Sequence, residues 1–273
     1  MNAFGAPRTS RETFVDFHNG ESKDQEKDAH GTTGIWLLAS RINHSCVGNC
    51  RRTFIGDMQI VRATRDIPAG TELQFTYRPA KAMESYEEVQ EGLKHWGFLC
   101  ECKLCRERKT TPRTILKERA ALRKLFGKAI TGPGPTKITK SSAILEKMEK
   151  TYSTTNSSPI RMELWDPYLA VGGHLLAAHR SAEAVKMIVK GFEAMGYSIS
   201  IQIPTKKQRE SRLEVERWGI VNELIPWVFV RLFEACSAVA PELCGHAKHY
   251  AEISYTMVVG EKETMSESFP EFG

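Results

Sequence analysis

The cysteines are the residues of this sequence whose spacing most directly indicates a chemical role, the binding of a metal ion. Three of its seven cysteines crowd into the motif Cys100-x-Cys102-x-x-Cys105, and Cys46 lies in a polar segment over 41–49. Four thiolates are a complete tetrahedral set for zinc, and such crowding favours a metal over disulfides in a reducing compartment. The sequence therefore predicts a structural Zn²⁺ site with Cys46, Cys100, Cys102 and Cys105 as its ligands.

Two alternatives to this ligand set stay open at this point. Cys50, four residues after Cys46, competes for the fourth position, and a group of buried free cysteines would need no metal. Cys236 and Cys244 lie in a different, helical stretch and are expected to be ordinary buried thiols, which behave as small hydrophobic groups.

A second group of polar residues could bind a ligand. The pair Asn43-His44 has no helical or strand periodicity to explain it, and an amide beside a backbone N–H suits a purine-like or amino-acid ligand. The alternative is a turn that forms its own hydrogen bonds. Tyr77 closes a predicted strand, where it is either a core tyrosine or a hydroxyl aimed at a reacting group.

The segment that must position these residues is predicted to be β-rich over 34–80. A buried run starts at 34–38, and strands over 51–55 and 58–64 flank Gly56-Asp57, a two-residue hairpin turn. A third strand is expected over 71–77, with Leu73, Phe75 and Tyr77 on one face because side chains alternate along a strand.

The rest of the chain is predicted to be helical. Apolar residues recur at helical spacing over 83–95, 113–128, 141–152, 165–180, 182–195, 213–239 and 247–259, with breaks over 131–136 and 154–159. Pro226 is expected to kink the helix over 213–239. The pair over 165–195, which ends at Gly196, resembles a tetratricopeptide-like hairpin, although no fixed repeat is clear.

These patterns predict an α+β fold in four parts. Residues 1–33 are expected to be poorly ordered, because 19–33 hold one apolar residue among many charges. A β region over 34–80, a helix with the cysteine cluster over 81–110, and an all-helical domain over 111–273 follow. The whole chain of 273 residues is long enough for two domains.

Composition limits the classes of partner. The net charge of +5 is mild and its basic residues read as scattered among acidic ones, which argues against direct nucleic-acid binding. Apolar runs are too short for a membrane span, and the first residues lack the apolar core of a signal peptide. We expect the protein to stay inside the cell, in the nucleus, the cytoplasm or both.

One family carries these motifs in the same order. Asn43-His44-Ser45-Cys46-x-x-Asn49, then Gly70-Thr71-Glu72-Leu73-x-Phe75-x-Tyr77, resembles the second half of the SET domain of protein lysine methyltransferases. The Cys-x-Cys-x-x-Cys that follows is similar to the post-SET zinc motif. The order and the helical C-terminal region look most like the SET and MYND-domain proteins and their fungal relatives. No Gly-x-Gly motif occurs before residue 34, so the N-terminal half of the SET domain is expected to be missing.

The resemblance implies a role for each matching residue. It implies that Asn43 and His44 contact S-adenosyl-L-methionine, that Phe98 stacks on its adenine, and that Tyr77 lines the methyl-transfer channel as the catalytic residue. It assigns the zinc to Cys46, Cys100, Cys102 and Cys105, with Cys50 as a bystander.

The function expected on these grounds is S-adenosylmethionine-dependent methylation of lysine in a protein substrate, histone or other, by a truncated enzyme. Such methyl transfer needs an aligned, neutral lysine and positioning oxygens rather than a catalytic metal. The alternative is a catalytically inactive, zinc-stabilised SET-like scaffold that binds a protein partner through its helical domain.

Overall fold

The computed structural model describes residues 4–6, 10–19, 32–134, 136–152, 160–204 and 210–272. It divides into two compact units. The first unit comprises Met1–Tyr77, Ile220–Val230 and Gly245–Gly273, and the second comprises Arg78–Gly219 and Arg231–Cys244. The predicted break over 154–159 lies outside the described residues, as does most of the N-terminal segment over 1–33. The mixed α and β class of the fold is confirmed.

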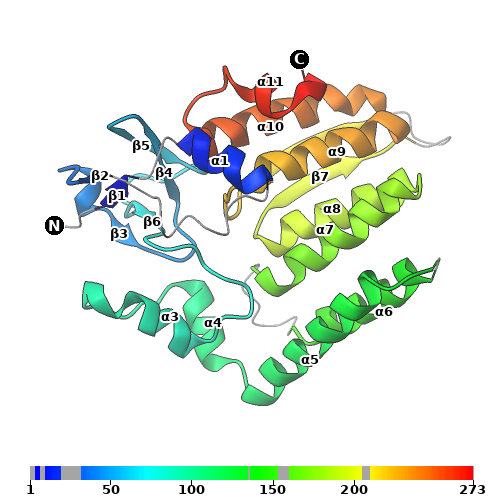
Figure 1. Cartoon of the computed structure of the whole chain (residues 1–273), viewed down its shortest axis with the longest axis horizontal. Helices are drawn as coiled ribbons and strands as arrows, with labels where there is room; N and C mark the ends of the chain where they lie inside the picture. Colours follow the sequence, from blue (N-terminus) through cyan, green and yellow to red (C-terminus); the bar gives the residue numbers. More distant parts are fainter. Residues whose placement is uncertain are drawn as a thin grey trace. The chain divides into compact units, whose positions relative to one another are not determined.

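Short two-stranded sheets form the β part of the first unit (Figure 1). Strand β1 (Phe4–Ala6) pairs with β2 (Thr32–Gly34), and β4 (Cys50–Ile55) pairs with β5 (Met58–Ala63), both antiparallel. Gly56 has φ +54° at the hairpin turn, a conformation that glycine adopts without strain, so the predicted hairpin is confirmed. Strand β3 (Asn43–His44) runs parallel to β6 (Gln74–Phe75).

Segments distant in sequence complete this unit. Helix α1 (Ser10–Asn19) lies in the N-terminal segment, where Phe14 makes edge-to-face contacts with Tyr255 of α10 (Cys244–Val259) and with Phe269. The centroid distances are 5.2 and 5.9 Å. Arg62 of β5 donates to the Gly260 carbonyl at 2.7 Å, which ties the hairpin to the end of α10. The short elements α11 (Met265–Ser268) and η4 (Pro270–Phe272) follow.

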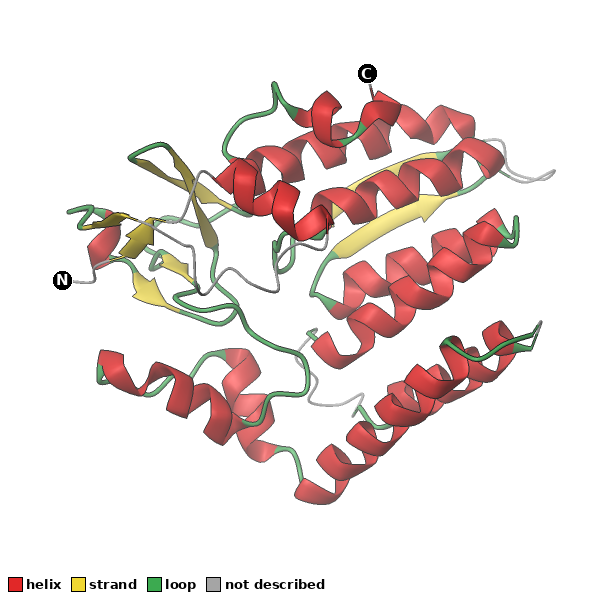
Figure 2. Ribbon diagram, in the orientation of Figure 1, coloured by secondary structure: helices red, strands yellow, loops and turns green. Residues whose placement is uncertain are grey.

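The second unit is mostly helical (Figure 2). Its elements in chain order are α3 (Tyr86–Leu93), η2 (Lys94–Trp96), α4 (Lys103–Thr110), α5 (Arg113–Ile130), α6 (Lys137–Lys150), α7 (Met162–Ala177), α8 (Ser181–Ala194), β7 (Ser198–Gln202) and β8 (Arg212–Arg217). Helices α5 and α6 form one antiparallel hairpin and α7 and α8 another. The helices predicted over 113–128, 141–152, 165–180 and 182–195 are thus confirmed, with shifted ends.

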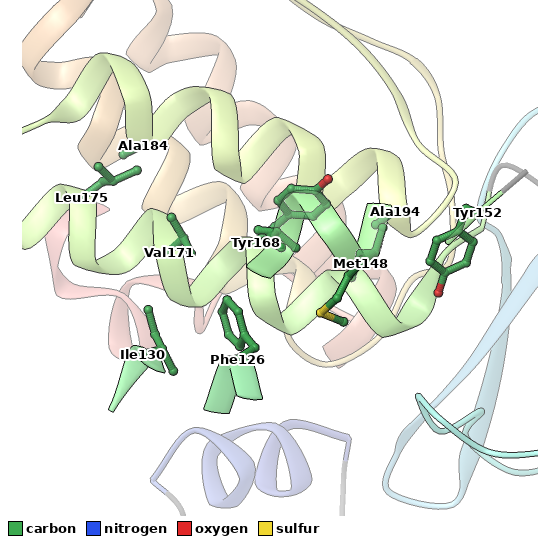
Figure 3. Close-up of a cluster of buried hydrophobic side chains, with 11 residues drawn as sticks. Phe126, Ile130, Met148, Tyr152, Tyr168, Val171, Leu175, Ala184 and Ala194 are labelled. Carbon is green, nitrogen blue, oxygen red and sulfur yellow. The ribbon is translucent and has the colours of Figure 1, made fainter. Parts of the chain in front are cut away.

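Apolar side chains from α5, α6, α7 and α8 form one buried cluster (Figure 3). Met148 of α6 and Leu164 of α7 are fully buried in it. Gly172 of α7 lies so close to α8 that an added Cβ would stand 3.3 Å from Ile188 Cγ1. Small residues therefore let these two helices pack closely, and the interface depends on them.

The helix predicted over 213–239 is wrong in its first part. Residues 212–217 form β8, which pairs with β7, and α9 (Ile225–Val239) begins only afterwards. Leu213 and Val215 alternate with Glu214 and Glu216, which is the period of a strand rather than a helix. Pro226 does not kink a long helix, because it is the second residue of α9, where its missing N–H has no intrahelical partner to lose.

A buried polar network crosses the helical core. The Tyr152 hydroxyl donates to Glu163 Oε2 at 2.5 Å, and the Arg119 guanidinium stacks 3.5 Å from the centre of the Tyr152 ring. Burial, followed by the nearby Glu163 carboxylate, raises the pKa of Tyr152 far above its ordinary value. Tyr152 therefore stays protonated and serves Glu163 as a hydrogen-bond donor.

We expect Tyr152→Phe to lower the free energy of unfolding by about 1–3 kcal/mol, because it leaves the buried Glu163 carboxylate without this donor. Urea unfolding monitored by circular dichroism measures the change. Tyr86→Phe, at a half-buried tyrosine on α3, serves as the control and should change it by less. Equal effects of the two substitutions would contradict a role for the Tyr152–Glu163 bond.

Glu107 of α4 makes the stability of the second unit depend on pH. Burial raises the pKa of its carboxyl above the ordinary value near 4.5, and the Arg119 charge opposes that rise. Since the folded state holds this proton more tightly than the unfolded state, the stabilisation is fully present below pH 4.5 and is lost as the pH rises through the folded pKa.

We expect Glu107→Gln, which mimics the protonated side chain, to raise the melting temperature at pH 7.5 relative to the unsubstituted protein and to change it little at pH 4. Differential scanning calorimetry at both values measures this. Glu118→Gln, at an exposed position of α5, is the control. A difference that is the same at both pH values would show that folding does not raise the pKa of Glu107.

Candidate functional site

The 41–49 segment lies along the strand that contains Gln74 and Phe75. Beyond the two-residue pairing of β3 with β6, the Ser45 N–H donates to the Phe75 carbonyl at 3.2 Å and the Asn49 N–H donates to the Gln74 carbonyl at 2.9 Å. The two motifs that the sequence analysis singled out are therefore brought together by backbone hydrogen bonds. This pairing fixes where the side chains of Asn43 to Asn49 stand.

The Asn49 side chain closes this segment. Its Nδ2 donates to the Glu72 carbonyl at 2.9 Å, and its Oδ1 accepts from the Gln74 N–H at 2.8 Å. Its own carbonyl accepts from the Thr64 N–H at 2.9 Å. Asn49 is buried, and one amide thus satisfies backbone groups on a neighbouring strand that would otherwise lack partners.

Gly48 permits this close approach. A Cβ added at residue 48 would stand 2.5 Å from the Gln74 carbonyl oxygen and 2.8 Å from Phe75 Cα. Both atoms belong to the backbone and cannot swing aside. Glycine is therefore required where the segment crosses the strand.

Both ring nitrogens of His44 are engaged. Its Nδ1 accepts from the Tyr77 N–H at 3.0 Å, so the ring proton resides on Nε2, which lies 3.4 Å from Cys46 Sγ. The ring thus links the backbone at Tyr77 to the thiol of Cys46.

Tyr77 lies beside this ring with its hydroxyl anchored. The hydroxyl donates to the Ile42 carbonyl at 2.8 Å, next to Asn43 in the chain, and the ring centroids of Tyr77 and His44 are 5.3 Å apart. Tyr77 is half-buried. Its hydroxyl proton is therefore directed at Ile42.

The remaining predicted cofactor residues are Asn43 and Phe98. Asn43 is exposed, and its Nδ2 donates to Glu72 Oε1 at 2.6 Å, which leaves its Oδ1 as an acceptor. Phe98 lies in the second unit, after η2 and Gly97, and is half-buried.

The strand expected over 71–77 is shorter than predicted: β6 spans two residues, and Leu73 is 46% exposed whereas Phe75 is 1% exposed.

Three of the thiols gather as the spacing predicts. The sulfur atoms of Cys100, Cys102 and Cys105, all in the second unit, lie within 4.8 Å of one another, and Cys46 of the first unit remains the predicted fourth ligand. Tetrahedral zinc with Zn–S bonds of about 2.3 Å places its four sulfurs about 3.8 Å apart, so the donor set and its spacing suit this metal. Cys50 lies on β4 opposite Ala63, where burial raises the pKa of its thiol.

Local hydrogen bonds and the start of helix α4 hold the thiols of Cys100, Cys102 and Cys105 in place. The Gln90 side chain donates to the Cys100 carbonyl at 3.2 Å and accepts from the Cys100 N–H at 2.8 Å. Cys102 is the N-cap of α4 and Cys105 lies in its first turn, where the positive end of the helix dipole favours thiolates. The sequence analysis did not single out Gln90, because its position in the predicted helix does not indicate that its side chain forms two hydrogen bonds with the Cys100 backbone.

The first part of the chain is similar to a known protein family. Residues 8–78 match the family model described as the SET domain. The chain contains a SET domain. The match starts at residue 8, ahead of residue 34, where the resemblance in the sequence begins.

Relatives of the SET domain carry transferase names. A "Methyltransferase" of Gibberella zeae is 51% identical over 269 residues, which cover 98% of this chain and 37% of that protein. "Histone-lysine N-methyltransferase set5" of Schizosaccharomyces pombe is 42% identical over 75 residues, 26% of this chain and 23% of that protein. "Protein-lysine N-methyltransferase SMYD4" of Homo sapiens is 35% identical over 74 residues, 27% of this chain and 9% of that protein. The chain thus spans little more than a third of the Gibberella zeae relative and less of the others.

We expect Asn49→Ala to destabilise the SET domain by about 1–3 kcal/mol, because it removes two hydrogen bonds and leaves the Glu72 carbonyl and the Gln74 N–H unpaired. Asn43→Ala is the matched control, since its amide is exposed and should cost less than about 0.5 kcal/mol. Thermal unfolding of both variants tests this. An equal loss in the two would mean that Asn49 does not hold the segment.

Proposed function

We propose that this chain is an S-adenosylmethionine-dependent protein lysine methyltransferase. The observation that carries the proposal is the joining of Asn43 and Tyr77 within a SET domain, through the bond from the Tyr77 hydroxyl to the Ile42 carbonyl. The names of the relatives support lysine methylation of proteins, histones among them. Among the described residues no helix is long and apolar enough to span a membrane.

In this proposal the chain's residues divide into two groups. Asn43 Oδ1, the main chain of His44, and the Phe98 ring hold S-adenosyl-L-methionine, and Tyr77 lines the transfer site. The cofactor supplies an electrophilic methyl group when bound. Tyr77 would line the channel through which the lysine enters, and burial of that lysine beside it would favour the neutral amine, because burial penalises the ammonium. Alignment then provides most of the rate.

We also propose that Cys46, Cys100, Cys102 and Cys105 bind one structural Zn²⁺. The grouping of Cys100, Cys102 and Cys105, the dipole of α4 and the Gln90 bonds to Cys100 support it. His44 Nε2–H would donate to the Cys46 thiolate, the kind of outer contact that orients metal ligands. The same ring accepts from Tyr77 N–H, so metal binding and the transfer site would share one imidazole.

A second candidate function is a zinc-stabilised scaffold without activity that binds a protein partner through its helices. The closely packed hairpin α7–α8, which covers the pair that resembles a tetratricopeptide hairpin in sequence, favours it. The two functions differ in what they require of Asn43, because only the enzyme needs it to hold the cofactor.

We expect zinc-loaded protein to bind S-adenosylmethionine with a micromolar Kd, about −8 kcal/mol, in isothermal titration calorimetry. Asn43→Ala should weaken binding at least tenfold without changing the melting temperature, since the side chain is exposed. Arg41→Ala, an exposed neighbour on the same segment, is the control and should bind as the unsubstituted chain does. Absence of binding by folded, zinc-loaded protein would overturn the enzyme and favour the scaffold.

A further inference from the structure

The positive charge of this chain is concentrated in one part of the second unit. Residues 103–150 contain fourteen Lys and Arg against four Asp and Glu, a net charge of +10. Because the whole chain carries +5, all other residues together carry −5. The basic residues are therefore not scattered once the segments are counted separately.

Helix α5 arranges four of these cations in a row. Arg113, Lys117, Lys124 and Lys128 are all exposed, and at 100° per residue they fall within about 60° of one another around the helix axis. They extend over about 22 Å along α5. The apolar face of the same helix, with Phe126 and Ile130, points the opposite way into the core.

Nothing acidic interrupts this row. The other positions beside the row are Ala120, Ala121 and Gly127, all exposed and too small to screen the long cationic side chains, and Leu125, which is 51% exposed, lies at its edge. None of the four cations forms an ion pair with any residue that the structure describes. Four unneutralised charges on one helix face favour a partner of high negative charge density.

We propose that this basic face of α5 binds the phosphate backbone of duplex nucleic acid. A protein interface uses buried aromatic or aliphatic anchors, and single-stranded nucleic acid uses aromatic rings for stacking. The face of α5 holds no aromatic ring and, apart from the single Leu125 at its edge, only cations and small residues. Cations without base-reading groups fix a duplex through its phosphates and read no sequence. This inference does not depend on methyl transfer.

Fluorescence anisotropy with a labelled 20-base-pair DNA duplex of mixed sequence tests it on the full chain. Four phosphate contacts predict a slope near −3.6 for log K against log salt, which is about a hundredfold loss of affinity between 50 and 200 mM salt. The triple substitution Lys117→Gln, Lys124→Gln and Lys128→Gln should flatten the slope by roughly three.

The matched control is Lys81→Gln, Lys186→Gln and Lys262→Gln, three exposed lysines off α5 whose loss changes the net charge equally. It should keep the slope and the affinity within about twofold. An equal loss in both triple variants would overturn the proposal, because net charge alone would then explain binding. So would displacement of the duplex by polyglutamate at equal charge concentration, which would assign the face to an acidic protein, or no binding at 50 mM salt.

Discussion

The buried amide of Asn49 is the interaction on which the SET domain of this chain depends. It holds the 41–49 segment against the strand at Gln74 by satisfying a backbone acceptor and a backbone donor of that strand. Gly48 makes the approach possible, since any side chain there would meet the backbone of Gln74 and Phe75. With this segment fixed, His44 reaches both Tyr77 and Cys46, and the Tyr77 hydroxyl reaches Ile42. The hydrogen bonds of the Asn49 amide thus help to position the residues proposed to bind the cofactor, to line the transfer site and to bind the metal.

Local pattern was enough for the parts of the fold that local physics determines. The hairpin around Gly56, the paired helices over 165–195 and the α5 stripe all follow from spacing and turn residues. The grouping of Cys100, Cys102 and Cys105 also followed from their spacing in the sequence. Their role as ligands remains a prediction.

Features that depend on distant partners could not be read from the sequence. Leu73 alternates with Phe75 yet is exposed, because β6 pairs for only two residues. Ile35, Leu37 and Leu38, expected to start a buried run, are exposed as well, whereas Trp36 packs against Phe54. The strand at 212–217 was missed because its partner lies beyond an intervening segment, although its alternation was visible. The net charge of +5 is the sum of +10 over residues 103–150 and −5 over all other residues, so the basic segment is seen only when charges are counted by segment.

The measurement that tests the central claim most directly is anomalous diffraction at the zinc edge, from crystals of this chain grown with S-adenosylhomocysteine. The claim is that the segment held by Asn49 positions both the proposed metal ligand Cys46 and the proposed cofactor residue Asn43, which lie close to His44 in the chain. It predicts one zinc about 2.3 Å from the sulfurs of Cys46, Cys100, Cys102 and Cys105, with the ligand's polar groups against Asn43. Zinc held through Cys50 instead, or a ligand bound away from Asn43, would contradict it.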